Sequence, residues 1–153
     1  MHTTTCLKYL VLAVVILGLS ACSSSNDSGT RTLETTLWEF LSYAEQGNVQ
    51  PILTGTTITA VFDRNVGNVY GSAGCNQYSG GFQAENDTLS VSQLAVTDMF
   101  CDSPEGVMEQ EQRYLTALEA AERFEAMGTQ LQILSSNELI LLFRATGGDN
   151  DIT

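Results

Sequence analysis

The chain of 153 residues carries 18 acidic residues against six Lys and Arg, and its formal net charge is −12. Binding to nucleic acid requires a basic face that neutralises phosphates, so we expect no nucleic-acid partner. The only lysine, Lys8, and the only histidine, His2, both lie near the N-terminus, which leaves the rest of the chain without two residue types common in catalytic and metal sites.

The N-terminal segment is typical of an exported lipoprotein. Lys8 precedes an apolar run over residues 9–19, which is too short to span a bilayer and ends in small residues. The sequence Leu-Ser-Ala-Cys that closes this segment resembles a bacterial lipobox, which implies removal of residues 1–21 and acylation of Cys22. The alternative is an ordinary signal peptide followed by a chance cysteine.

A lipid on Cys22 would anchor the protein firmly, because several acyl chains on one residue bind a membrane better than one. By resemblance to enterobacterial sorting, Ser23 favours the outer membrane, with the domain facing the periplasm. Without residues 1–21, five arginines stand against 18 acidic residues, and the formal charge becomes −13. This charge repels an anionic lipid surface, so the lipid itself is the expected membrane contact.

The remaining chain divides into three parts. Residues 22–32 are rich in serine and contain no large apolar side chain, which predicts a flexible tether after the lipidated cysteine. Residues 33–145 are long enough for one domain with one core. Residues 146–153 form a polar tail.

Most of the domain carries strand signals. Apolar and polar residues alternate with β-branched enrichment over residues 56–62, which predicts a strand with Ile58, Ala60 and Phe62 on its buried face. Asn86-Asp87 predicts a short hairpin between two further strands. The strand segments predicted in this way are 36–43, 56–62, 69–74, 80–85, 88–94, 129–134 and 138–143.

One helical segment interrupts the strands, over residues 102–124. Ser103 can cap the helix, Pro104 suits its first position and Glu105 lies near the positive end of its dipole. The residues of its apolar stripe are expected to pack in the core, and they are Met108, Leu115, Leu118 and Ala121. The prediction is therefore a mainly β fold with one α-helix, a small antiparallel β-barrel-like domain.

Three motifs occur in an order and spacing that resemble the META domain, also called HslJ-like: GSAGCNQYSGGF (71–82), LAVTDMFC (94–101) and MEQEQRYLTAL (108–118). Trp38 and a closing strand that ends near Phe143 also fit. The resemblance implies a compact β-rich fold with one helix, often found in bacterial envelope lipoproteins, with some members linked to heat or drug stress. It implies no agreed catalytic reaction.

The sequence departs from the family pattern at two positions. Asp98 stands where these domains usually carry a basic residue, and Val96 stands where methionine is common. The resemblance therefore implies that an anion bound by that basic residue in relatives would not be bound in the same way here.

The glycine-rich stretch 71–82 does not fit a phosphate-binding loop, because it leads into a predicted strand instead of a helix and no lysine accompanies it. Cys75 within it and Cys101 are most simply joined by a disulfide in an exported protein. Two buried thiols are the second possibility. A reactive thiol is the third, since Cys101 lies just before the predicted helix start.

Asn76 and Tyr78 follow Cys75 in the motif. We expect Asn76 to bond the local backbone and Tyr78 to pack its ring with its hydroxyl near the surface, with a ligand contact as the alternative for each. Asp98 is flanked by apolar residues, so a general-acid role with a partner such as Asp63 or Glu85 is the remaining route to catalysis.

The sequence thus favours a non-enzymatic envelope lipoprotein whose domain binds an unknown periplasmic ligand or protein in envelope maintenance or stress tolerance, without metal or cofactor. One alternative is an acidic inhibitor of a cationic enzyme such as lysozyme. A carboxylate-dependent hydrolase is the other.

Overall fold

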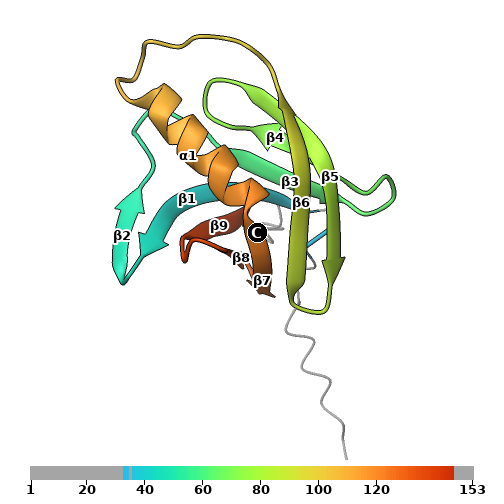
Figure 1. Ribbon diagram of the computed structural model, residues 1–153. Helices are drawn as coiled ribbons and strands as arrows, with labels where there is room; N and C mark the ends of the chain where they lie inside the picture. Colours follow the sequence, from blue (N-terminus) through green and yellow to red (C-terminus); the bar gives the residue numbers. More distant parts are fainter. Residues whose placement is uncertain (1–32, 35, 147–153) are drawn as a thin grey trace, which may run out of the picture.

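The computed structural model describes residues 33–34 and 36–146 (Figure 1). Cys22 and the polar tail beyond Thr146 lie outside these residues. The described part holds nine strands and one helix, in the order β1 (Leu37–Glu45), β2 (Asn48–Pro51), β3 (Thr59–Asp63), β4 (Asn68–Ser72), β5 (Gln77–Glu85), β6 (Thr88–Val96), α1 (Val107–Glu119), β7 (Ala121–Met127), β8 (Gln130–Ser135) and β9 (Ile140–Thr146). Within that part, no helix has the length and apolar character needed to cross a bilayer.

The strands close into an antiparallel barrel. Neighbouring strands follow the order β1-β3-β4-β5-β6-β7-β8-β9, and β9 pairs back onto β1, from Leu37↔Thr146 to Ala44↔Ile140. β2 pairs only with the second half of β1 and stands outside this ring. Closure removes the exposed edges that an open sheet would present. The mainly β, barrel-like fold predicted from the sequence is confirmed.

The barrel has two different ends. At one, which we call the hairpin end, short turns join β3 to β4, β5 to β6 and β7 to β8. At the other, which we call the helix end, four connections meet α1, which lies across the barrel beside β6 (Figure 1). These connections are residues 52–58, 73–76, 97–106 and 136–139.

Buried polar groups of α1 tie it to the connections of the helix end. The Gln110 side chain accepts a hydrogen bond from Leu53 N at 2.6 Å and donates one to Thr56 Oγ1 at 3.0 Å. Ser135 at the end of β8 donates its hydroxyl to Ala117 O at 2.7 Å. The helix is therefore fixed as a cover over this end of the core.

The core is built from alternating strand positions and the inner face of α1. Ile58, Ala60 and Phe62 are all fully buried, as the alternation predicted. Aromatic rings join the two parts, since the Phe40 centroid lies 5.2 Å from that of Tyr114 on α1. Burial of each large apolar side chain stabilises the fold by about 1.5–3 kcal/mol. The largest fully buried side chains include Trp38, Phe40, Phe62, Tyr114 and Phe143.

The predicted helix start is wrong. Ser103 and Pro104 lie in the preceding connection, joined by a cis peptide bond, and the N-cap is Gly106, which has a φ of 86° and provides no side-chain cap. Val107 N donates to Pro104 O, so a tight turn precedes the helix. A left-handed N-cap explains why glycine stands there.

The predicted helix is also too long, because it ends at Glu119 and the chain enters β7 at once. The sequence AERFEAM of β7 is rich in helix formers, but its pairing with β8 from Ala121↔Ser135 to Met127↔Gln130 overrides that local preference. Ala121 is buried as expected, but from a strand. β2 was not predicted either, since all four of its residues are exposed.

Candidate functional site

The motif GSAGCN forms the tight connection between β4 and β5. Gly71 lies so close to β3 that a Cβ there would stand 2.0 Å from Thr59 O, which only glycine avoids. Gly74 has a φ of 117°, and Ala73 N donates to Asn76 O at 2.8 Å to close the turn. This conformation directs the N–H groups of Cys75 and Asn76 toward α1.

Glu111 of α1 receives these N–H groups. Its Oε2 accepts hydrogen bonds from Cys75 N at 3.1 Å and Asn76 N at 2.6 Å, and its Oε1 accepts one from Asn76 Nδ2 at 2.7 Å. The residue is 5 % exposed, and the salt bridges of the described residues do not include it. Three N–H donors therefore compensate a buried carboxylate in place of a cation.

Asn76 uses its whole side chain inside the protein. Its Oδ1 accepts hydrogen bonds from Thr97 Oγ1 and Met99 N, each at 2.7 Å. Its Nδ2 donates to Met99 O at 3.0 Å and to Glu111. An amide side chain has two donor hydrogens and two acceptor lone pairs, so no group of Asn76 is left for a ligand. The expectation that Asn76 bonds its own backbone is therefore wrong, because its side chain binds the connection 97–106 and Glu111.

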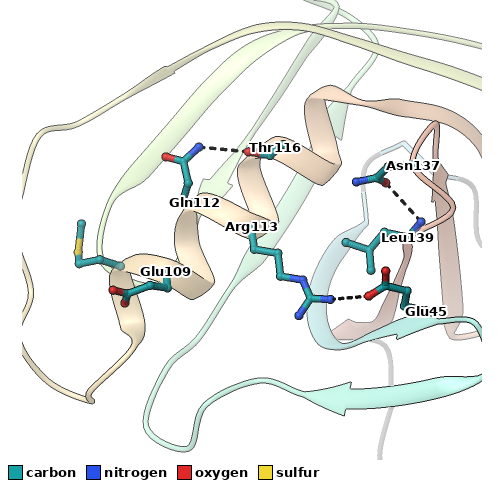
Figure 2. A pocket seen from close by; sticks show the side chains of 8 residues that line it. Glu45, Glu109, Gln112, Arg113, Thr116, Asn137 and Leu139 are labelled. Atoms are coloured by element: carbon teal, nitrogen blue, oxygen red, sulfur yellow. Dashed lines mark hydrogen bonds and ion pairs between the residues drawn. The ribbon is translucent and has the colours of Figure 1, made fainter.

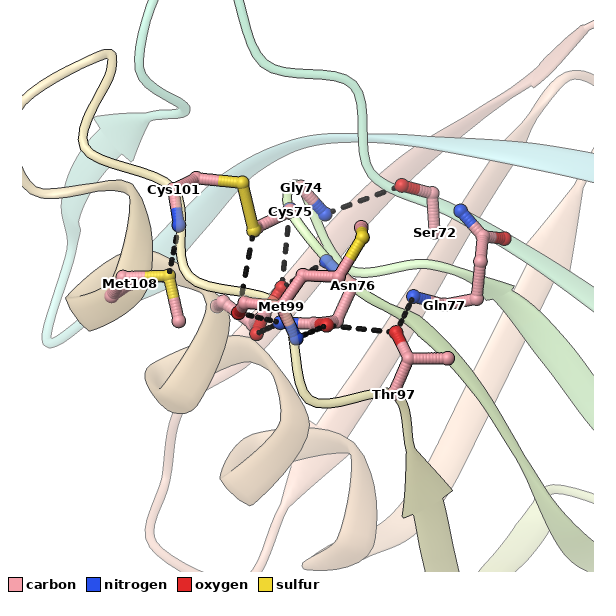
Figure 3. The surroundings of a disulfide bond; sticks show 10 residues. Ser72, Gly74, Cys75, Asn76, Gln77, Thr97, Met99, Cys101 and Met108 are labelled. Carbon is pink, nitrogen blue, oxygen red and sulfur yellow. Dashed lines mark hydrogen bonds between the residues drawn. A yellow bond between two sulfur atoms is a disulfide. The ribbon is translucent and has the colours of Figure 1, made fainter.

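Cys75 and Cys101 are joined by a disulfide, with an S–S distance of 2.00 Å and 6.0 Å between the Cα atoms (Figure 3). The bond links the β4–β5 turn to the connection 97–106, beside the Asn76 hydrogen bonds. Because the bonded sulfurs are not thiolates, this form of the protein offers no nucleophile at Cys75 or Cys101. Among the described residues, no group of three or more His, Cys, Asp or Glu is placed to hold a metal ion.

Tyr78 points into the core, so the expectation that its hydroxyl lies near the surface is wrong. Its hydroxyl donates to Thr59 O at 2.9 Å and lies 2.8 Å from the Tyr114 hydroxyl, which donates to it. Burial raises the pKa of both tyrosines well above the usual value, and at Tyr114 the Tyr78 hydroxyl adds to the rise. The pair is a buried, neutral hydrogen bond inside the barrel.

Asp98 lies in the exposed connection at the helix end. Asp98 follows Thr97, whose N–H donates to the carbonyl of Gln77, the first residue of β5. Glu85 is the last residue of the same strand. Eight strand steps separate those positions by about 26 Å. Asp63 accepts a hydrogen bond from Asn65 N in the β3–β4 turn at the hairpin end. The structure therefore does not bring Asp98 together with either suggested partner.

A groove of about 620 Å³ lies on the outer face of α1, between the helix, the end of β1 and the β8–β9 connection (Figure 2). Arg113 crosses it and donates to Glu45 Oε2 at 3.2 Å and to Gln50 Oε1 at 2.7 Å. Its guanidinium also lies 4.5 Å from the centre of the Tyr43 ring. Met108 and Leu139 add apolar walls, so the expectation that Met108 packs in the core is wrong. The groove offers charges of both signs and apolar surface to a solute.

The sequence did not single out Glu111, Tyr114 or Thr97. A signal for the first two exists, because Val107, Glu111, Tyr114 and Leu118 are spaced by four, three and four residues and share one helix face. A carboxylate within an apolar stripe indicates a buried partner. No pattern marks Thr97, whose role depends on where Asn76 lies.

The fold and the site together define a helix-covered antiparallel β-barrel whose central polar residues bond one another. The META domain profile matches residues 31–147, and the chain belongs to the META domain family. A comparison with curated proteins found no match.

Three solved structures share the fold. The NMR structure of a protein from Burkholderia xenovorans is 25% identical, with a TM-score of 0.64 over 80% of this chain and 90% of that one. Another NMR structure is 20% identical, with a TM-score of 0.56 over 74% and 94%. The crystal structure of a DUF4847 family protein from Bacteroides vulgatus is 14% identical, with a TM-score of 0.55 over 76% and 96%.

Proposed function

We propose that the protein is a lipid-anchored, non-catalytic META-domain protein of the bacterial envelope that binds a periplasmic ligand or protein. The observation that carries the proposal is that the polar side chains of the motif bond other groups inside the protein. Asn76, Glu111, Tyr78 and both motif cysteines are engaged with one another or with the backbone. Function is then a property of the surface, which the motif holds in shape.

The anchor and the location rest on the sequence. The lipobox ending at Cys22 supports attachment to a membrane, and Ser23 supports the outer membrane facing the periplasm. A disulfide between Cys75 and Cys101 fits an oxidising compartment. A role in envelope maintenance or stress tolerance rests on the family resemblance.

The proposal is tested on the full chain expressed in a bacterium, beside the Cys22→Ala variant. Detergent-phase partition and the mass of the N-terminal peptide should show a triacylated cysteine in the wild type and none in the variant. The variant should also fail to restore growth of a deletion strain under envelope stress. An unmodified Cys22 in the wild type, or substrate turnover abolished by one carboxylate substitution, would contradict the proposal.

A second candidate function is inhibition of a cationic enzyme such as lysozyme. The observation in its favour is the group of exposed acids on the connection 97–106, which are Asp98, Asp102 and Glu105. Lysozyme assays at low and high salt, with the purified protein as inhibitor, test it. Salt-sensitive inhibition would support this function, and unchanged lysis at low salt would remove lysozyme as the target.

A further inference from the structure

The connection 97–106 presents a large apolar side chain to solvent. Phe100 is 84 % exposed and Met99 beside it is 54 % exposed. Phe100 is the most exposed of the large hydrophobic side chains in the described part of the chain. An aromatic ring in water forgoes the 1.5–3 kcal/mol or so that burial would provide, so its position needs an explanation.

A loose loop does not explain this exposure, because the backbone on both sides of Phe100 is fixed. Met99 donates its N–H to Asn76 Oδ1 and accepts from Asn76 Nδ2 at its carbonyl. Cys101 is held by the disulfide to Cys75, and its N–H points to Met108 Sδ at 3.5 Å. The buried cluster around Asn76 thus holds the ring outward, and a partner would bind it without first ordering the loop.

Acidic residues flank Phe100 in the sequence. Asp98 and Asp102 stand two residues before and after Phe100, Glu105 follows, and all three are exposed. The sequence contains no Lys, Arg or His between residues 65 and 112. An exposed aromatic residue with acidic neighbours in the chain complements an apolar pocket rimmed by Arg or Lys, which can pair with the acids and stack on the ring.

The chain enters the barrel at the end opposite this loop. β1 begins at the hairpin end of the barrel, where Leu37 pairs with Thr146, and Phe100 lies at the helix end. A lipid on Cys22 would therefore join the domain at the end opposite Phe100. That placement, together with the negative charge, favours a protein partner over the lipid surface.

We propose that the connection 97–106 is a docking element that inserts Phe100 into an apolar pocket of a basic protein, with Asp98 and Asp102 engaging the pocket's cationic rim. The inference rests on the proposed binding function and names its surface and the chemistry of its partner. Aromatic side chains at the centre of an interface commonly dominate its binding energy, and flanking charges accelerate association.

The experiment pans a phage-displayed library of random twelve-residue peptides against the full-length protein in mild detergent. Enriched peptides are synthesised with a fluorophore, and their Kd is measured on the wild type, on Phe100→Ser and on Val66→Ser. Val66 is 72 % exposed in the β3–β4 turn at the hairpin end, so it is the matched control. Unfolding midpoints verify that both variants fold.

We expect enriched peptides to combine Arg or Lys with large apolar residues. Phe100→Ser should weaken them by about tenfold or more, as for an interface hot spot, while Val66→Ser leaves the Kd unchanged. Asp98→Asn with Asp102→Asn should slow association at low salt, with a smaller difference at high salt.

Four results would overturn the inference: failure to enrich any peptide, peptides without basic residues, peptides insensitive to Phe100→Ser, or Phe100-dependent binding to zwitterionic vesicles or to a second copy of the chain. Peptides that bind elsewhere would leave the binding function standing. Catalytic turnover would instead remove the proposed function itself.

Discussion

Glu111 and Arg113 lie two residues apart on α1, and their surroundings are opposite. Glu111 points into the barrel and is compensated by three N–H donors from the β4–β5 turn. Arg113 points outward and remains partly exposed to water, and it contacts Glu45, Gln50 and the Tyr43 ring. Charged residues at this spacing occupy different helix faces, and burial decides how much each contributes to stability.

The comparison indicates that the Arg113–Glu45 ion pair contributes less to stability than the buried hydrogen bonds of Glu111. The pair between Arg113 and Glu45 has side chains 36% and 49% exposed, and such pairs contribute about 0–1 kcal/mol. Glu111 makes no ion pair among the described residues, but its removal would leave buried donors without acceptors. Four predictions test this difference, from the largest expected effect to the smallest.

Glu111→Ala should lower the free energy of unfolding by about 4 kcal/mol, because three buried N–H donors lose their acceptor and each costs about 1–3 kcal/mol. The control Glu109→Ala, an exposed acid on the same helix, should stay within about 0.5 kcal/mol. Urea unfolding with an unchanged m-value measures both. A loss below about 1 kcal/mol for Glu111→Ala would break the comparison, since it would equal that of an exposed ion pair.

Replacing both Cys75 and Cys101 by serine should cost about 3.5 kcal/mol in the chain-entropy account of a bond that spans 26 residues. This prediction sharpens the comparison, because it separates the covalent link from the Glu111 hydrogen bonds at the same turn. Reductant should produce a similar loss in the wild type and none in the double variant. Equal stability of oxidised and reduced wild type would contradict it, and non-reducing peptide mapping verifies the bond.

Stability should fall above a pH of about 10, the pKa of tyrosine in an unfolded chain. Burial raises the pKa of Tyr78 and Tyr114 well above 10, and raises that of Tyr43 to about 12 against the opposing effect of Arg113. The unfolded chain therefore loses protons that the folded chain keeps. Each tyrosine lowers the free energy of unfolding by about 1.4 kcal/mol per pH unit above 10, and contributes no slope below it.

Urea midpoints from pH 8 to about 11 measure this slope, and Tyr43→Phe should remove one tyrosine's share of it. The prediction extends the comparison to neutral groups, since Tyr114 shares the inner helix face with Glu111. A flat profile above pH 10 would show that water reaches these hydroxyls.

Arg113→Ala should have the smallest effect, about 1 kcal/mol or less, from the loss of the exposed ion pair and of the contact with Tyr43. High salt should reduce even this difference. Thermal and urea unfolding of the wild type and the variant measure it. A loss as large as that of Glu111→Ala would reverse the comparison.

Features that depend on a pattern within one element could be predicted from the sequence. The alternation of Ile58, Ala60 and Phe62 identified the buried face of β3 and of the residue that precedes it, and Asn86-Asp87 marked the β5–β6 hairpin. The Cys75–Cys101 pairing that the sequence favoured is present in the structure. These features depend on local periodicity or on a small number of candidate partners.

The rest depends on contacts between distant segments. β7 reads as helix from Ala121 onward, and only its partner β8 makes it a strand. Asn76 and Thr97 become one cluster only when the β4–β5 turn meets the connection 97–106. The helix start at Gly106 follows from a tight turn, so capping residues at Ser103 and Pro104 were misleading.

The closure of β9 on β1 also sets how the domain would respond to mechanical tension. Leu37, the first residue of β1, pairs with Thr146, the last residue of β9. A force applied through these two strand ends would pull the same rung apart, so the hydrogen bonds of this seam would break one after another. Strands loaded in this way unzip at lower force than strands loaded in shear. The seam would therefore open from the hairpin end, and the pair Ala44↔Ile140 at the helix end would separate last.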